Sequence, residues 1–134
     1  MTTRTATIER TYATSPQVVF DAWRDVDVLT TWWGCAPEML WRVHEWAFEV
    51  GGAIRVSQTF GDQDYEVNGR FTEIESPSST VFDWEAGQQI AVSIDATDDG
   101  TRMRIDHHGL SDEMHPIVTE GWTASFGQIG DALA

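Results

Sequence analysis

Large apolar residues recur at steps of three and four over residues 116–134, which places them on one face of a helix. They are Val118, Trp122, Phe126, Ile129 and Leu133. Gly121, Gly127 and Gly130 lie in the same stretch, and each costs about 1 kcal/mol of helix stability relative to alanine. The pattern therefore predicts a long C-terminal helix that depends on packing its apolar face against a broad apolar surface.

Alternating apolar and polar residues predict strands over most of the remaining chain. The first strand is expected over Arg4–Tyr12. Six more are expected over residues 39–49, 53–60, 64–75, 80–86, 89–97 and 101–108. Glycine, proline, serine and aspartate separate these six strands in connections too short for a crossover helix. Neighbouring strands are therefore expected to pair as an antiparallel meander.

Two short helices are expected directly after the first strand. Ser15, followed by a proline, is typical of a helix start, because its hydroxyl can accept a hydrogen bond from a free backbone N–H group. The apolar residues that follow share one face, which predicts a helix over residues 16–24. Asp25 or Asp27 is expected to cap a second helix over residues 28–33.

This order of elements, supported by short motifs along nearly the whole chain, resembles a known fold. The motifs are Ile8-Glu9-Arg10, Ser15-Pro16, residues 19–23, residues 29–34, residues 49–52, Gly69, Ser76-Pro77, residues 81–84, Gly100-Thr101, His107-His108-Gly109 and Gly121-Trp122. The chain resembles the helix-grip superfamily, also called START-like, SRPBCC or birch-pollen-allergen-like. Within it, the chain resembles the family named after the C-terminal domain of the activator of the heat-shock protein 90 ATPase.

The resemblance implies a single α+β domain of residues 1–134. In such a domain a curved antiparallel sheet of about seven strands wraps the long C-terminal helix and encloses a cavity. Two features depart from the family pattern. Glu49-Val50 replaces a usual basic residue, and Pro116 is expected to shorten the last helix at its start. The family name does not assign an activity, because many bacterial members are free-standing domains without a known ligand.

Strand alternation selects the side chains that are expected to face the long helix. Most of these side chains are apolar and a few are polar, which is typical of a small-molecule site. The expected ligand-binding residues are Trp23, Trp32, Val56, Gln58, Phe60, Phe82, Trp84, Val92, Ile94, Met103, Ile105, His107, Trp122 and Phe126. Trp23 and Trp32 are expected at the mouth, while Gly121, Ala124 and Ser125 are expected to leave room beside the helix. The alternative is that the side chains meet and leave no cavity.

His107 is the polar residue of this wall that is best suited to catalysis. A histidine in apolar surroundings could act as a general acid or base near neutral pH. The alternative is a hydrogen-bonded core histidine without a catalytic task. Glu45 would join His107 if its strand turned it inward, and Gln58 could orient a ligand or satisfy a backbone group. His108, one residue along the strand, is expected to point outward.

Charge and composition exclude several partners. The chain has 22 acidic residues, eight arginines and no lysine, with a net charge of −14. Such a surface repels phosphate groups, so nucleic acids and anionic membranes are not expected as partners. The acidic residues are scattered along the sequence, which favours a uniformly solvated surface over a docking site for a basic partner.

Cysteine, histidine and hydropathy patterns limit the chemistry further. The single cysteine, Cys35, excludes an internal disulfide and fits a reducing compartment; its thiol is either reactive or an ordinary loop thiol. The histidines lack metal-ligand spacing, and no loop typical of phosphate binding precedes a helix, so no metal or cofactor is expected. A cytoplasmic location is expected, because the sequence shows neither a signal peptide nor a long apolar run.

Three functions are compatible with these observations. The first is binding of a hydrophobic or aromatic small molecule between the sheet and the long helix. The second is a cyclase, dehydratase or hydrolase-like enzyme that uses His107, as the resemblance to the wider superfamily implies. The third is a protein-interaction module with Trp32, Trp33 or Trp41 exposed as contacts. Edge strands and exposed aromatic residues would also allow a homodimer.

Overall fold

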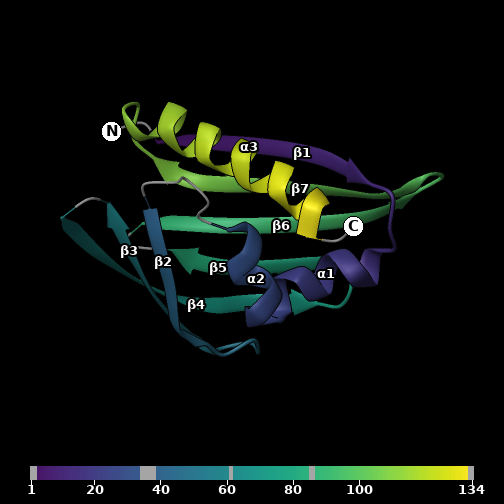
Figure 1. Ribbon diagram of the computed structural model, residues 1–134, viewed down its shortest axis with the longest axis horizontal. Helices are drawn as coiled ribbons and strands as arrows, with labels where there is room; N and C mark the ends of the chain where they lie inside the picture. The colour runs from purple at the N-terminus through teal and green to yellow at the C-terminus, as the bar shows by residue number, and fades with distance from the viewer. Residues whose placement is uncertain (1–2, 34–38, 61, 85–86, 133–134) are drawn as a thin grey trace.

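The structure, a computed structural model, describes residues 3–33, 39–60, 62–84 and 87–132. In these residues seven strands form one antiparallel sheet in the order β1-β7-β6-β5-β4-β3-β2 (Figure 1). The strands are β1 (Arg4–Tyr12), β2 (Met39–Trp46), β3 (Ala53–Phe60), β4 (Gln63–Glu75), β5 (Ser79–Trp84), β6 (Gln88–Thr97) and β7 (Gly100–Leu110). The helices are α1 (Pro16–Arg24), α2 (Val26–Trp32) and α3 (Met114–Ala132).

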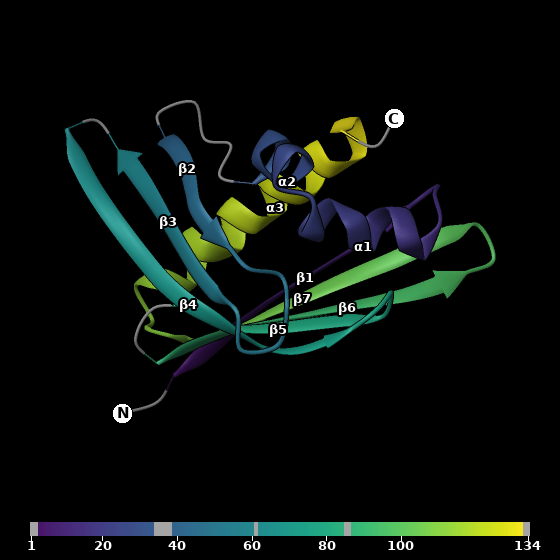
Figure 2. The same ribbon diagram turned by 90° about the horizontal axis from the view of Figure 1, so that it is seen from below.

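The sheet is strongly curved, and the helices lie on its concave side (Figure 2). The long helix α3 packs along the edge strand β1, while α2 contacts α3, α1 and β2. The expected α+β helix-grip architecture is therefore confirmed. None of the helices in the part of the chain that the structure describes is both long and apolar enough to cross a bilayer.

Capping side chains set the starts of the two short helices. Ser15 Oγ accepts from the backbone N–H of Val18 at 3.4 Å, and α1 has the expected bounds. Helix α2 begins at Val26, two residues earlier than expected, because Asp25 is its cap: the Asp25 carboxylate accepts from the N–H of Asp27 at 3.0 Å. Both starts follow from side chains that replace missing helical acceptors.

The long helix α3 also begins two residues earlier than the sequence predicted. The expectation that Pro116 shortens it is wrong, because this proline is the third residue of α3, within the first turn, where an N–H group would have no helical acceptor. Ser111 Oγ accepts from the N–H of Met114 at 3.2 Å just before the helix. Of the predicted apolar stripe, Trp122, Phe126 and Ile129 are buried, Val118 is half-buried and Leu133 lies outside the described residues.

The glycines and small residues of α3 do not lie where the sequence analysis placed them. Gly121 and Ala124 are exposed, so the expectation that they leave room between α3 and the sheet is wrong. Ser125 alone of the three is buried. Edge strand β1 instead holds the helix through Tyr12, whose hydroxyl donates to the backbone oxygen of Phe126 at 2.8 Å.

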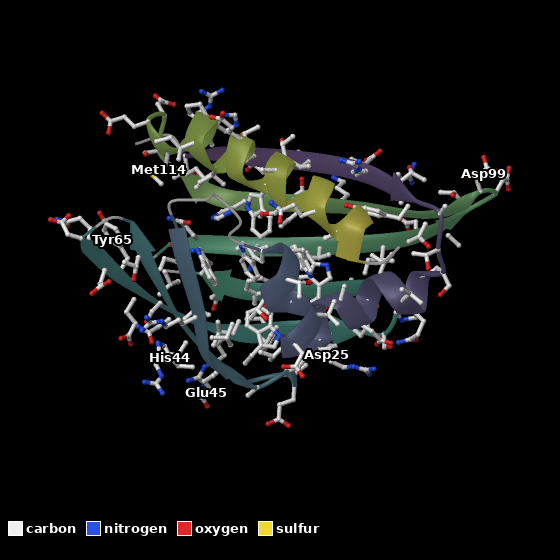
Figure 3. All side chains as sticks on the ribbon, in the orientation of Figure 1. Asp25, His44, Glu45, Tyr65, Asp99 and Met114 are labelled. Carbon is white, nitrogen blue, oxygen red and sulfur yellow. The ribbon has the colours of Figure 1, made fainter. Side chains whose placement is uncertain are left out.

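A bulge in β2 decides which of its side chains face the core. The pairing with β3 shifts between Val43 and Glu45, so that Val43 lies opposite Val56 and Trp46 lies opposite Ile54. Trp46 is therefore buried and Glu45 is exposed. His44 and Glu45 project away from the helices (Figure 3). The idea that Glu45 turns inward beside His107 is wrong for this reason.

Alternation on the other strands is confirmed. The predicted concave residues of β5, β6 and β7 are buried, and so is Val56 of β3, while Gln58 is half-buried. The side chain of Phe60 lies outside the described part of the chain. His108 points outward as expected and shares a hydrogen bond of 3.0 Å with Thr5 Oγ1.

Candidate functional site

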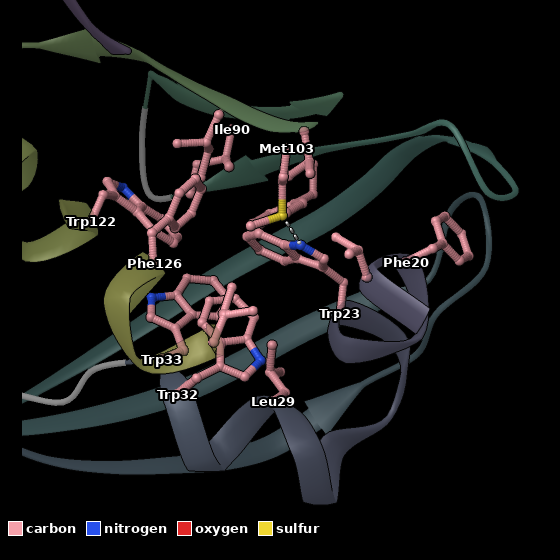
Figure 4. Close-up of a cluster of buried hydrophobic side chains, with 14 of the residues drawn as sticks. Phe20, Trp23, Leu29, Trp32, Trp33, Ile90, Met103, Trp122 and Phe126 are labelled. Carbon is pink, nitrogen blue, oxygen red and sulfur yellow. Dashed lines mark hydrogen bonds between the residues drawn. The ribbon is translucent and has the colours of Figure 1, made fainter. Parts of the chain in front are cut away.

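Seven aromatic side chains meet between α3 and the sheet, and we call them the ring layer. They are Trp23 of α1, Trp32 and Trp33 at the end of α2, Trp46 of β2, Phe82 and Trp84 of β5, and Trp122 of α3. Figure 4 shows that several of these rings approach one another from different elements. Four of the seven come from the helices, so the layer forms only when the helices dock on the sheet.

Trp33 lies at the centre of the ring layer. Its ring centroid is 5.0 Å from that of Trp122 on α3 and 5.2 Å from that of Trp84 on the sheet. Its other ring neighbours are Trp23 and Trp46 at 5.6 Å, Trp32 at 6.0 Å and Phe82 at 6.2 Å. Trp33 is not among the expected ligand-binding residues, and its expected role as an exposed contact is wrong, since it is 5% exposed.

Trp23 and Trp32 lie deeper in the ring layer than expected. Both are 1% exposed or less, so their expected place at a mouth is wrong, and so is the exposed contact role of Trp32. The Trp23 Nε1–H donates to the sulfur of Met103 at 3.1 Å, and the Trp32 Nε1–H donates to the backbone oxygen of Ala22 at 3.1 Å. The indole of Trp41, the third proposed contact, lies outside the described side chains.

A chain of hydrogen bonds leads from the ring layer to the half-buried Gln88. The Trp122 Nε1–H donates to His107 Nδ1 at 3.0 Å, so this nitrogen carries no proton. The proton of the neutral ring is then on Nε2, which donates to Gln88 Oε1 at 2.6 Å. Burial lowers the pKa of His107 to about 4, and the charge of nearby His108 acts in the same direction. His107 is therefore neutral at physiological pH.

These contacts decide what His107 can do in this conformation. Both ring nitrogens are engaged, one as acceptor and one as donor, and the partners are an indole and an amide. A substrate could exchange a proton with the imidazole only after one of these bonds broke. The arrangement favours a role in joining α3 to the sheet. Gln88 is not among the expected site residues, because the strand predicted from the sequence begins one residue after the observed start of β6.

The remaining predicted residues form an apolar wall under the ring layer. Val56, Val92, Ile94, Met103, Ile105 and Phe126 are all buried in the same hydrophobic cluster as the rings. Tyr12 and Phe71 belong to this cluster as well and were not predicted as site residues. The residues of this wall that the structure describes carry no charge, and Gln88 and His107 bring an amide and an imidazole beside it.

Metal chemistry finds no support in the described side chains. Within residues 3–33, 39–60, 62–84 and 87–132, no three histidine, cysteine, aspartate or glutamate residues gather as a metal site would require. Cys35, the candidate reactive thiol, lies outside the described residues.

With this geometry in place, comparison with known proteins identifies the family. The family model described as activator of Hsp90 ATPase homolog 1-like protein matches residues 13–134. The chain belongs to this family. The fold of the activator of Hsp90 ATPase homolog 1-like family often serves ligand binding. No curated protein matches the chain.

Solved structures share the helix-grip fold of this family member. A crystal structure of a Chromobacterium violaceum protein is 21% identical, with 96% of each chain covered and a TM-score of 0.87. An AHSA1-like protein from Aeromonas hydrophila is 19% identical, with 97% of this chain and 92% of that chain covered and a TM-score of 0.82. A protein from Arthrobacter aurescens is 24% identical, with coverages of 96% and 85% and a TM-score of 0.82.

Proposed function

We propose that the protein binds a hydrophobic or aromatic small molecule between the sheet and α3, in contact with the ring layer. The observation that carries the proposal is the connection of the ring layer to a polar group near the surface. Trp122 links through His107 to Gln88, which is half-buried. Apolar walls with a few oriented polar groups are the usual composition of small-molecule sites.

The rings indicate the shape and charge of the ligand. The planes of Trp33 and Trp84 lie 28° apart at a centroid distance of 5.2 Å, which is the stacked arrangement that flat aromatic groups adopt. His107 is neutral and the surrounding cluster is hydrophobic. An ionised ligand would lose its hydration there without a counter-charge. A flat, neutral and largely apolar molecule fits these surroundings best.

The side of the ring layer near Gln88 is the side from which we expect a ligand to approach. Trp33, Trp84 and Trp122 retain 5%, 6% and 5% exposure, whereas Trp23 and Trp32 are sealed at 1% and 0%. A ligand that enters beside Gln88 would first meet Trp84, which pairs with Gln88 in the sheet, and Trp122, which is linked to Gln88 through His107.

Calorimetric titration with a panel of neutral aromatic compounds tests this function. We expect at least one compound to bind saturably and to raise the melting temperature, as any ligand specific for the native state does. Trp122→Ala should weaken binding of this compound about tenfold or more, because the variant loses both the buried area of the indole and its aromatic contact with the ligand. Trp122→Phe provides a milder variant that keeps a ring in place.

Tyr65→Ala is the matched control, because it removes an aromatic ring of β4 that is 50% exposed and is not part of the ring layer. Binding should be unchanged in this variant. A broad panel without one saturable titration of the wild-type protein would refute the proposed function. Equal loss of affinity in the Trp122 variants and in the Tyr65 control would place binding elsewhere.

A further inference from the structure

The central ring of the ring layer, Trp33, occupies the position that a ligand would have to take. Trp33 is the ring that bridges α3 and β5, with its centroid 5.0 Å from Trp122 and 5.2 Å from Trp84. This is the space in which the proposed function places the ligand. We propose that the Trp33 indole is an internal occupant of the ligand site, and that the ligand is a neutral bicyclic aromatic molecule of indole size that takes its place. This inference rests on the proposed function.

The rings around Trp33 define a space for a flat molecule. Trp32 and Trp84 lie nearly parallel to Trp33, with interplanar angles of 11° and 28°. Trp46 meets it edge-on at 84°, and Trp23 meets it at 63°. Near-parallel rings stack on the face of a planar guest, while perpendicular rings limit its edges. A planar bicyclic molecule reproduces these contacts, whereas a bulky aliphatic molecule does not.

Hydrogen bonds hold the walls of this space independently of Trp33. The Trp46 Nε1–H donates to the backbone oxygen of Trp23 at 2.8 Å, and the Trp122 Nε1–H donates to His107 Nδ1 at 3.0 Å. Trp84 and Phe82 stand on β5, which is paired on both sides in the sheet. The walls are therefore expected to keep their positions when the central ring is absent.

Trp33 itself stands at the end of a short helix. It caps the C-terminal end of α2, a helix of seven residues, and its backbone N–H donates to Leu29 O at 3.1 Å. Helices of this length have little stability of their own in water and depend on tertiary packing. By contrast, Trp122 stands within a helix of 19 residues. Among the rings of the layer, Trp33 is the one whose displacement disturbs the least regular structure.

Competition with Trp33 has a measurable consequence for affinity. A ligand that binds only when the indole has moved out has its apparent affinity reduced by the fraction of molecules in that state. Removing the Trp33 side chain removes this competition and leaves an apolar space. Such spaces stay dry and bind aromatic molecules of matching size.

The test compares indole binding to the wild-type protein and to Trp33→Ala by calorimetry and by melting temperature. We expect Trp33→Ala to bind indole saturably and about tenfold or more tightly than the wild type does. Phe71→Ala is the matched control. Phe71 is also a fully buried ring; it contacts Trp46 and Phe82 but is not itself part of the ring layer. Its removal leaves a space outside the ring layer and should not change indole binding.

The outcomes separate the two proposals. If Trp33→Ala is folded and binds indole no more tightly than the wild type, the inference is overturned, even where the wild type binds other aromatic compounds and the proposed function stands. If the wild type binds no aromatic compound of the panel, the proposed function fails, whatever the variant does. Trp33→Leu gives the same comparison should the alanine variant not fold: it must bind indole more tightly than the wild type, and equal affinity overturns the inference.

Discussion

Lowering the pH should destabilise this protein through His107 in particular. The native state keeps the imidazole neutral, because burial lowers its pKa from 6.5 to about 4. The unfolded chain binds a proton with the ordinary pKa of 6.5, so protonation favours unfolding at any pH between these two values. The stability supplied by the neutral ring is thus complete above pH 6.5 and is lost as the pH falls towards 4.

The size of the effect follows from the difference between the two pKa values. A shift of one unit corresponds to 1.36 kcal/mol, so the change from 6.5 to about 4 amounts to about 3 kcal/mol over the whole range. Roughly 2 kcal/mol of this is lost by pH 5. Because domains of this size are stable by only about 5–15 kcal/mol, the loss is large enough to measure.

Urea denaturation followed by tryptophan fluorescence at several pH values between 7.5 and 4.5 measures the effect. Because the chain has 22 acidic residues besides His107, the informative quantity is the difference between the wild type and His107→Gln. Glutamine can accept from Trp122 and donate to Gln88, but it does not titrate. The stability of the wild type should fall relative to the variant as the pH drops from 6.5.

Two parallel stability curves for the wild type and His107→Gln would refute this reasoning. A direct NMR titration offers a second check, since it should find the His107 ring neutral at pH 5 with its proton on Nε2. A native pKa near 6.5 would show that the ring is hydrated and that its hydrogen bonds to Trp122 and Gln88 do not persist.

Three further variants test the anchoring of α3 and the roles of two glycines. Tyr12→Phe removes the hydroxyl that donates to Phe126 O; the free energy of unfolding in urea should fall by about 1 kcal/mol, and an unchanged value would show that this bond contributes nothing. Gly121→Ala should raise the stability by up to about 1 kcal/mol, because an added Cβ meets nothing within 4 Å on the exposed face of the helix. Gly69→Ala should be strongly destabilising, because its Cβ would collide with the backbone oxygen of Asp83. Thermal melts compare the two glycine variants, and similar melting temperatures for both would contradict this reasoning.

Local signals predicted most of the secondary structure because they act over a few residues. Ser15 caps α1 where a serine–proline pair indicates a helix start, and the turn residues separate strands that pair with their sequence neighbours. The apolar periodicity of β6 and β7 predicted their buried faces for the same reason, since one face of each strand packs against the helices.

The bulge in β2 shows where local patterns fail. Aromatic residues lie on both faces of this segment, so alternation could not assign its register. Pairing with β3 shifts at His44 and turns Trp46 inward and Glu45 outward. That shift depends on the partner strand, which no window of the sequence contains.

Some residues of the candidate site could be predicted from the sequence, and others became evident only from the tertiary structure. The sequence by itself determined the apolar faces of α3 and of the central strands, and with them the burial of Trp122, Phe82 and Trp84. Tertiary structure alone decided that Trp33 lies at their centre and that Gln88 completes the contacts of His107. The physical reason is that periodicity records which side of an element is buried, whereas the contacts of a ring at the end of a short helix depend on how several elements dock together.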